Sequence, residues 1–139
     1  MGRVMAIDPG AKRCGIAVTD PMRIIASALD TVDTAELPVY LQRYLAKEAV
    51  DGFVVGVPRG LDGSVTDGTA PAIAVVEALR KAHPACFVEV VDERFTSVLA
   101  ERTLLASGKG RMARRDKGQL DRISATILLQ DWMNRNPGR

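Results

Sequence analysis

Hydrophobic and polar positions first form short apolar runs and then alternate between apolar runs and amphipathic stretches. Apolar runs over 4–8 and 14–18 flank a Pro-Gly turn whose tip carries Lys12 and Arg13, which predicts a hairpin of two buried strands. A further apolar, β-branched run predicts a third strand over 23–32. Three consecutive strands favour an antiparallel start to the sheet.

After this region, predicted helices and strands alternate. A stripe at helical spacing, Leu37, Leu41, Tyr44 and Leu45, predicts a helix over 34–49 that Asp33 or Thr34 caps. Downstream, the pattern predicts a buried strand over 52–57, a helix over 69–83, another buried strand over 87–91, a helix over 97–105, a basic connector over 107–118, a final helix over 120–133 and a frayed tail over 134–139. This order predicts an α/β fold: a mixed five-stranded sheet with an antiparallel hairpin section and parallel crossovers, flanked by helices.

Composition is that of an ordinary globular protein. The 139 residues are 47% hydrophobic and 26% charged, which predicts one soluble domain over 1–139. No apolar stretch approaches the roughly 20 residues of a membrane span, and the N-terminus lacks a signal-peptide pattern, so we expect a cytoplasmic protein. Cys14 and Cys86 lie in apolar runs without paired spacing, which predicts reduced core thiols rather than a disulfide or a zinc site.

Three acidic residues stand where the predicted layout would bring them together. Asp8 ends the first strand, Glu93 follows the last strand, and Asp121 falls in the first turn of the predicted final helix, on its apolar face. Sites in such sheets gather at the C-terminal ends of the strands. Carboxylates without histidine or thiolate suit Mg²⁺ or Mn²⁺, and two such ions can support phosphodiester hydrolysis.

Each acidic residue also has a structural interpretation. Asp8 could start a β-turn with the following Pro-Gly, and Asp121 could cap a helix N-terminus. The Asp92-Glu93-Arg94 run could form a salt bridge at a strand end, and strand alternation leaves open whether Asp92 or Glu93 faces the site.

Basic residues are concentrated near these carboxylates. The connector contains one acidic residue, Asp116, and five basic ones: Lys109, Arg111, Arg114, Arg115 and Lys117. It could be a solvated loop, but beside a carboxylate site it would bind phosphates, and Lys12, Arg13 and Arg94 would extend that surface. Because only 4% of residues are aromatic, recognition of backbone and shape is favoured over base stacking.

Several sequence blocks together resemble the YqgF/RuvX-type family of bacterial proteins, described as Holliday-junction resolvases and as nucleases of the 16S rRNA precursor's 5′ end. The blocks are Ala6-Ile7-Asp8-Pro9-Gly10 with Lys12-Arg13 and Gly15-Ile16-Ala17-Val18, Val55-Gly56-Val57-Pro58 with Asp62-Gly63-Ser64, Asp92 to Ser97, and Asp121 followed by Ala125 and Ile127 to Gln130. The resemblance implies an RNase H-like fold with Asp8, Glu93 and Asp121 as metal-binding catalytic carboxylates.

These observations predict a metal-dependent, two-metal-ion endonuclease that acts on structured nucleic acid. A four-way DNA junction would favour a homodimer with two active sites, whereas trimming of precursor rRNA could be done by a monomer. One alternative is a non-catalytic RNA-binding ribosome-maturation factor. Another is a phosphotransferase of the actin-like or sugar-kinase type, which the chain length and the lack of a second Asp-x-Gly phosphate loop disfavour.

Overall fold

The core of the molecule is a mixed five-stranded sheet. The computed structural model describes residues 2–10, 12–58, 63–93 and 117–137, with only the backbone described for 117–120. The strands are β1 (Arg3–Pro9), β2 (Arg13–Thr19), β3 (Ala26–Asp33), β4 (Val50–Val57) and β5 (Phe87–Asp92). Their order is β3-β2-β1-β4-β5, with antiparallel β1–β2 and β2–β3 pairs and parallel β1–β4 and β4–β5 pairs. The predicted mixed sheet is confirmed.

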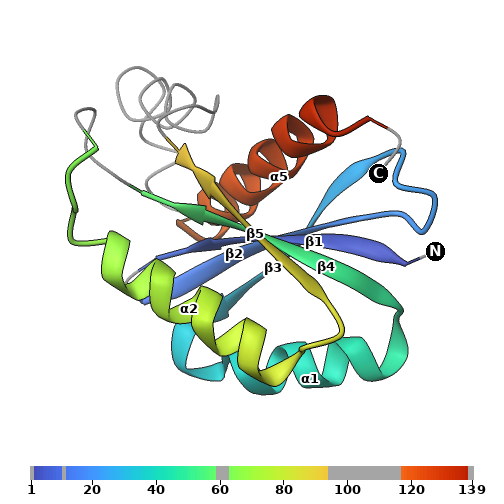
Figure 1. Ribbon diagram of the computed structural model, residues 1–139, viewed down its shortest axis with the longest axis horizontal. Helices are drawn as coiled ribbons and strands as arrows, with labels where there is room; N and C mark the ends of the chain where they lie inside the picture. Colours follow the sequence, from blue (N-terminus) through green and yellow to red (C-terminus); the bar gives the residue numbers. More distant parts are fainter. Residues whose placement is uncertain (1, 11, 59–62, 94–116, 138–139) are drawn as a thin grey trace.

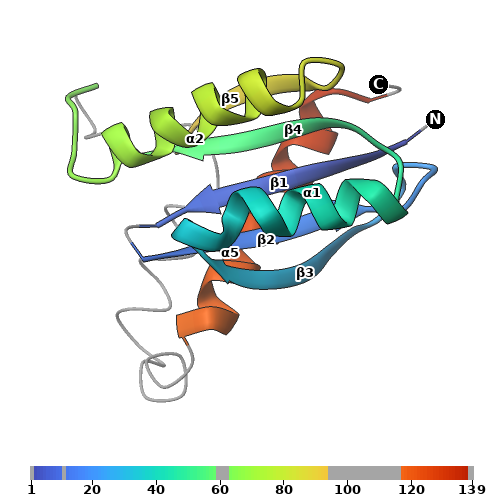
Figure 2. The same ribbon diagram turned by 90° about the horizontal axis from the view of Figure 1, so that it is seen from below.

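Helices cover both faces of the sheet. On one face lie α1 (Leu37–Lys47), which follows the 3₁₀ turn η1 (Thr34–Glu36), and α2 (Thr69–Ala82). On the other face α5 (Lys117–Arg135) crosses the strands obliquely (Figures 1 and 2). Among the described helices, none has both the length and the apolar character that a membrane crossing requires.

Alternation along the central strands creates two separate hydrophobic cores. Met5 and Ile7 of β1 pack with the residues of α1 and α2, whereas Val4 and Ala6 pack against α5. All four are fully buried, because β1 has a strand on each side and helices on both faces. This arrangement explains why β1 and β4 are continuous apolar runs rather than alternating ones.

The strand over Phe87–Asp92 differs from the prediction of a buried strand. It is the outer strand of the sheet, most of its residues are only half-buried, and Val90 is 49% exposed. A guanidinium N–H of Arg80 in α2 donates to the carbonyl of Val88 at 3.3 Å. An apolar sequence run therefore did not distinguish an edge strand from an internal one.

The last helix is longer than predicted at both ends. It begins at Lys117, so part of the predicted connector is helical, and Asp121 lies in the second turn rather than the first. It continues to Arg135 into the predicted tail, where the side-chain amide of Asn136 donates to the carbonyl of Trp132 at 2.8 Å. The predicted helix over 97–105 and the rest of the connector lie outside the described residues.

The predicted helix cap has a different role. Neither Asp33 nor Thr34 makes a side-chain capping bond, and the α-helix begins only at Leu37. Instead, the amide of Thr34 donates to the carbonyl of Lys12 at 2.9 Å, and its hydroxyl donates to the carbonyl of Gly10 at 3.2 Å. Thr34 thereby fastens the β1–β2 turn, which carries two of the predicted phosphate-binding residues.

The third strand begins later than predicted, at Ala26 rather than at residue 23. The side chain of Asp20 accepts hydrogen bonds from the amides of Ile24 at 2.7 Å and Ile25 at 2.8 Å, so these residues belong to a tight turn. A carboxylate that satisfies neighbouring amides competes with strand pairing.

Candidate active site

The site is built around a buried carboxylate on the central strand. Asp8 is the penultimate residue of β1 and is 3% exposed. Because side chains alternate along a strand, Asp8 projects to the same face as Val4 and Ala6, which pack against α5. A buried carboxylate in this position requires polar or cationic partners, because burial penalises its charged form.

Glycines flank Asp8 on both neighbouring strands. Gly15 of β2 pairs directly with Asp8. On the other side Ile7 pairs with Val55, so the next residue of β4 beside Asp8 is Gly56. Glycine within a strand commonly marks a place where another part of the chain approaches closely.

The space left by each glycine is occupied by one of the other two predicted site residues. A Cβ on Gly15 would lie 1.9 Å from the backbone oxygen of Asp121, and a Cβ on Gly56 would lie 2.7 Å from Oε1 of Glu93. The two missing side chains therefore let a helix backbone and a second carboxylate approach Asp8 from opposite sides. Neither glycine was predicted as a site residue from the sequence, although glycine inside an apolar strand is the signal that could have indicated it.

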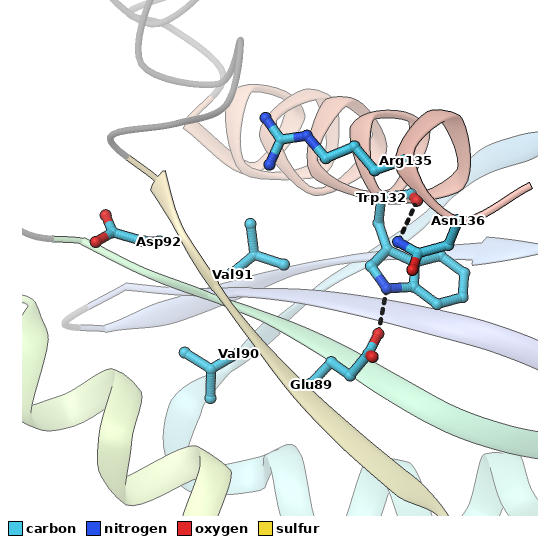
Figure 3. A pocket seen from close by; sticks show the side chains of 7 residues that line it. All are labelled: Glu89, Val90, Val91, Asp92, Trp132, Arg135 and Asn136. Atoms are coloured by element: carbon cyan, nitrogen blue, oxygen red, sulfur yellow. Dashed lines mark hydrogen bonds between the residues drawn. The ribbon is translucent and has the colours of Figure 1, made fainter.

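The structure shows on which side of the sheet each residue of the acidic pair at the end of β5 lies. Glu89 accepts a hydrogen bond from the indole of Trp132 in α5, and Val91 packs in the same core. In Figure 3, Val90 and Val91 project to opposite sides of β5, with Val91 directed toward α5. By the same alternation Glu93, which is 5% exposed, lies on the α5 side and Asp92 on the other.

A cavity of about 320 Å³ lies at the outer edge of the sheet, between β5 and the last turn of α5. Trp132 forms one wall of the cavity (Figure 3). Its ring stacks on that of Phe87 with the ring centroids 6.0 Å apart. The cavity lies along β5 from Glu89 to Asp92, and none of Asp8, Glu93 and Asp121 lines it.

The third carboxylate belongs to α5 and is paired with an arginine. Oδ2 of Asp121 lies 3.4 Å from Nε of Arg13 at the start of β2, with the two side chains 29% and 38% exposed. Since Asp121 is in the second turn, the interpretation that it caps the helix N-terminus is not supported. The neighbouring Arg122 donates to the hydroxyl of Thr31 in β3 at 3.3 Å, and sequence reasoning had not included this cation.

The negative charge of the site affects the pKa of Cys14, the residue that follows Arg13. Burial raises the pKa of the Cys14 thiol, and the carboxylates of Asp8 and Asp121 raise it further, against the lowering effect of a hydrogen bond with Thr34. Cys14 is a fully buried free thiol, as predicted, whereas Cys86 is only half-buried.

The three carboxylates do not form a finished metal cage. Among the residues that the structure describes, no three side chains of His, Cys, Asp or Glu are arranged so that they could hold a metal ion. The donors available are three carboxylates, the oxygen ligands that Mg²⁺ and Mn²⁺ prefer. The metal-ligand set of Asp8, Glu93 and Asp121 thus remains a prediction.

The predicted phosphate-binding residues are only partly described. Lys12 is exposed and Arg13 half-buried, both at the end of the sheet that carries Asp8. Lys117 is the first residue of α5. The remaining basic residues of the prediction lie outside the described part of the chain: Arg94, Lys109, Arg111, Arg114 and Arg115.

Comparison with known proteins identifies the family. A family model described as "RuvX: Holliday junction resolvase" matches residues 2–135. The chain belongs to the RuvX family. Similar proteins include a Porphyromonas gingivalis protein that is 44% identical over 139 residues, covering all of both chains, and a Bacteroides fragilis protein that is 44% identical over 133 residues, covering 96% of each. Both carry the name "Putative pre-16S rRNA nuclease".

Solved structures confirm the fold expected of a RuvX-family protein. The Fowlpox virus resolvase, solved with Holliday junction DNA, aligns with a TM-score of 0.58 at 11% identity, covering 96% of this chain and 97% of that one. The RuvC protein of T. thermophilus, also solved with a Holliday junction, aligns with a TM-score of 0.52 at 15% identity, covering 99% and 97%. The RuvX-family chain therefore has the RNase H-like fold of resolvases, and its family places it among the nucleases, a class of hydrolases.

Proposed function

We propose that this RuvX-family protein is a divalent-metal-dependent endonuclease that hydrolyses phosphodiester bonds in structured nucleic acid. Asp8, Glu93 and Asp121 are its catalytic carboxylates. The observation that carries the proposal is the position of Asp8 between two glycines, whose empty space admits the backbone of Asp121 on one side and the carboxylate of Glu93 on the other. A purely structural aspartate would not require a glycine beside it on both neighbouring strands.

The three carboxylates differ in how firmly the fold holds them. Asp8 stands on the central strand of the sheet, and Asp121 on a helix whose backbone rests against Gly15, so these two are rigidly placed. Glu93 follows the end of an outer strand and has the longer side chain. A site built this way has two fixed oxygen donors and one that can adjust.

The residues fit a hard divalent cation by their donor chemistry. Asp8, Glu93 and Asp121 would hold Mg²⁺ or Mn²⁺, and two ions per site would supply an activated water and stabilise the leaving oxygen. Without cations, clustered carboxylates repel one another and the phosphate backbone alike. Lys12, Arg13 and the other basic residues of this end would bind the phosphates on either side of the cut.

The substrates to compare are a four-way DNA junction and a 16S precursor RNA. The relatives' names point to the RNA and the structural neighbours' complexes to the junction, and phosphodiester hydrolysis is common to both. Paired incisions in a junction would require two sites, and a RuvX-family homodimer would provide them. Light scattering of the purified protein, with and without junction, measures whether it is a monomer or a dimer.

The test compares the wild type with Asp8→Asn on both substrates, in Mg²⁺, in Mn²⁺ and with chelator. The matched control is Asp20→Asn, the same chemical change in the exposed β2–β3 turn at the opposite end of the sheet. We expect the wild type and Asp20→Asn to cut only with metal, and folded Asp8→Asn to bind nucleic acid without cutting. If folded wild type binds RNA but cuts neither substrate in any metal, the protein is a non-catalytic RNA-binding factor and the proposal is wrong.

A further inference from the structure

We propose that Arg13 is the counter-ion of Asp121 in the free protein, that it competes with the divalent cation for this carboxylate, and that it becomes available to a nucleic-acid phosphate when the cation binds. The inference rests on the proposed function, because it concerns the same carboxylate site. It assigns to Arg13 a positioning role that differs from that of the neighbouring Lys12.

The backbone directs Arg13 toward the acidic site. Arg13 begins β2, and alternation places it on the same face as Gly15 and Ala17, the face that α5 covers. Gly15 brings the backbone of Asp121 against this strand, and Nε of Arg13 lies 3.4 Å from Oδ2 of Asp121. Gly15 therefore makes room for the backbone of Asp121, and Arg13 pairs with its carboxylate.

The turn that carries Arg13 is held in place. The carbonyl of Arg13 accepts a hydrogen bond from the amide of Gly10 at 2.8 Å. On the other side, the amide and hydroxyl of Thr34 bind the carbonyls of Lys12 and Gly10. With its backbone fixed, Arg13 can change partners by rotating its side chain alone.

The positive charge of Arg13 affects cation binding by Asp121 more than the ion pair affects folding stability. Both side chains are about a third exposed, and pairs of this kind contribute little to folding. A positive charge beside a carboxylate does, however, reduce the affinity of that carboxylate for any other cation, as it does for a proton. Asp121 in the free protein is thus a weaker cation ligand than it would be without Arg13.

The competition makes cation binding and phosphate binding cooperative. When Asp121 ligates a cation, its hold on Arg13 weakens, and the guanidinium can bind a phosphate instead. By linkage, a phosphate that captures Arg13 raises the affinity of the site for the cation by the same factor. The site would then bind its cations most tightly when substrate is present.

The first test is a calorimetric titration of Mn²⁺ into the free wild type, Arg13→Gln and Lys12→Gln. Lys12→Gln is the matched control, because it removes one positive charge from the same turn and Lys12 is exposed. We expect Arg13→Gln to lower the Mn²⁺ dissociation constant by about tenfold, the effect of one pKa unit, and Lys12→Gln to change it by less than about twofold. Arg13→Lys keeps the charge, so its affinity stays within about twofold of the wild type.

A second test needs no metal and therefore involves no cleavage. In chelator, the binding of a fluorescent four-way junction is compared for Arg13→Gln in the wild-type and Asp121→Asn backgrounds. We expect the substitution to weaken binding less than about twofold in the wild type, where Asp121 holds Arg13, and by about tenfold in Asp121→Asn, where Arg13 is released.

The outcomes separate this inference from the proposed function. If the wild type binds Mn²⁺ but Arg13→Gln matches Lys12→Gln, or if the effect on junction binding is equal in both backgrounds, Arg13 is an ordinary phosphate contact and only this inference falls. If folded wild type binds no Mn²⁺, the metal-dependent function falls together with it.

Discussion

Gly15→Ala tests the central feature of the site, because it adds a single methyl group at the point where α5 meets β2. The new Cβ would lie 1.9 Å from the backbone oxygen of Asp121 and 2.3 Å from its carbonyl carbon. Both are main-chain atoms, so rotating a side chain cannot relieve the clash. The second turn of the helix must move away from the strand, or the strand must shift away from the helix.

The size of the movement follows from the contact. Separations below 3.0 Å are essentially never seen for a Cβ, so the distance between residue 15 and the backbone oxygen of Asp121 must increase by at least about 1.1 Å. Overpacking of this kind costs about 1–3 kcal/mol of folding free energy. Because a misplacement of about 1 Å at a catalytic group can cost about 100-fold in rate, we expect cleavage to fall by about that factor.

The assay measures stability, helix packing and cleavage on the same samples. Trp132 is the one tryptophan of the chain, and its contacts with Phe87 and Glu89 make its fluorescence a reporter of how α5 rests on the sheet. The control is Gly52→Ala, whose Cβ would clash at 2.3 Å with the ring of Phe87, on the same face but near the start of β4. It should lower stability comparably while the folded fraction still cleaves.

The refuting result is clear-cut. If Gly15→Ala cleaves at the wild-type rate per folded molecule and its Trp132 emission is unchanged, α5 does not depend on the gap at Gly15. The position of Asp121 would then not depend on the absence of a side chain at Gly15. If Gly52→Ala loses as much activity per folded molecule as Gly15→Ala, the loss reflects general loosening rather than displacement of Asp121.

Three further predictions address the cores, the turn at the opposite end of the sheet and the buried thiol. Leu128→Ala removes a fully buried side chain of α5 and should cost about 2–5 kcal/mol in urea unfolding, and a loss below about 1 kcal/mol would contradict the packing. The hydrogen bond from the amide of Gly2 lowers the pKa of Asp51, and Arg23 lowers it further. The contribution of Asp51 to the free energy of unfolding, below about 1 kcal/mol, is therefore present near neutral pH and lost as the pH falls through that lowered pKa. Asp51→Asn and wild type should therefore differ in unfolding free energy at pH 7, begin to approach each other near the ordinary pKa of 3.8 and converge only below the lowered pKa of Asp51. Burial raises the pKa of Cys14, so at pH 8 its thiol should react with Ellman's reagent at least about 100-fold more slowly in native protein than in urea, and equal rates would exclude the buried position.

Elements with a strong local signal were predictable from the sequence. The hairpin was visible because two apolar runs flank a Pro-Gly turn, and β4 because a run buried on both faces must be apolar throughout. The edge position of β5 was not predictable, because Val88 and Val90 read the same whether or not another strand lies beside them. Position in the sheet is a tertiary property that an apolar run does not encode.

For the site, the sequence indicated the acidic residues but not what arranges them. Asp8, Glu93 and Asp121 stood out because charge interrupts or ends apolar patterns. The roles of Gly15 and Gly56 could not be predicted, because the parts of the chain that fill their space come from far away in the sequence. The face of Glu93 likewise became clear only through the bond between Glu89 and Trp132.

The packing of Asp121 against Gly15 also determines when the candidate active site can assemble during synthesis of the chain. The two strands that carry Asp8 and Gly15 leave the ribosome long before the helix that carries Asp121, and at about 5–20 residues per second the interval lasts several seconds or more. During that interval the helix-facing side of the sheet, including Val4 and Val54, is uncovered and the acidic cluster still lacks Asp121. A chain made beside ribosomal RNA thus acquires its proposed cutting centre only after the helix that begins at Lys117 has been synthesised.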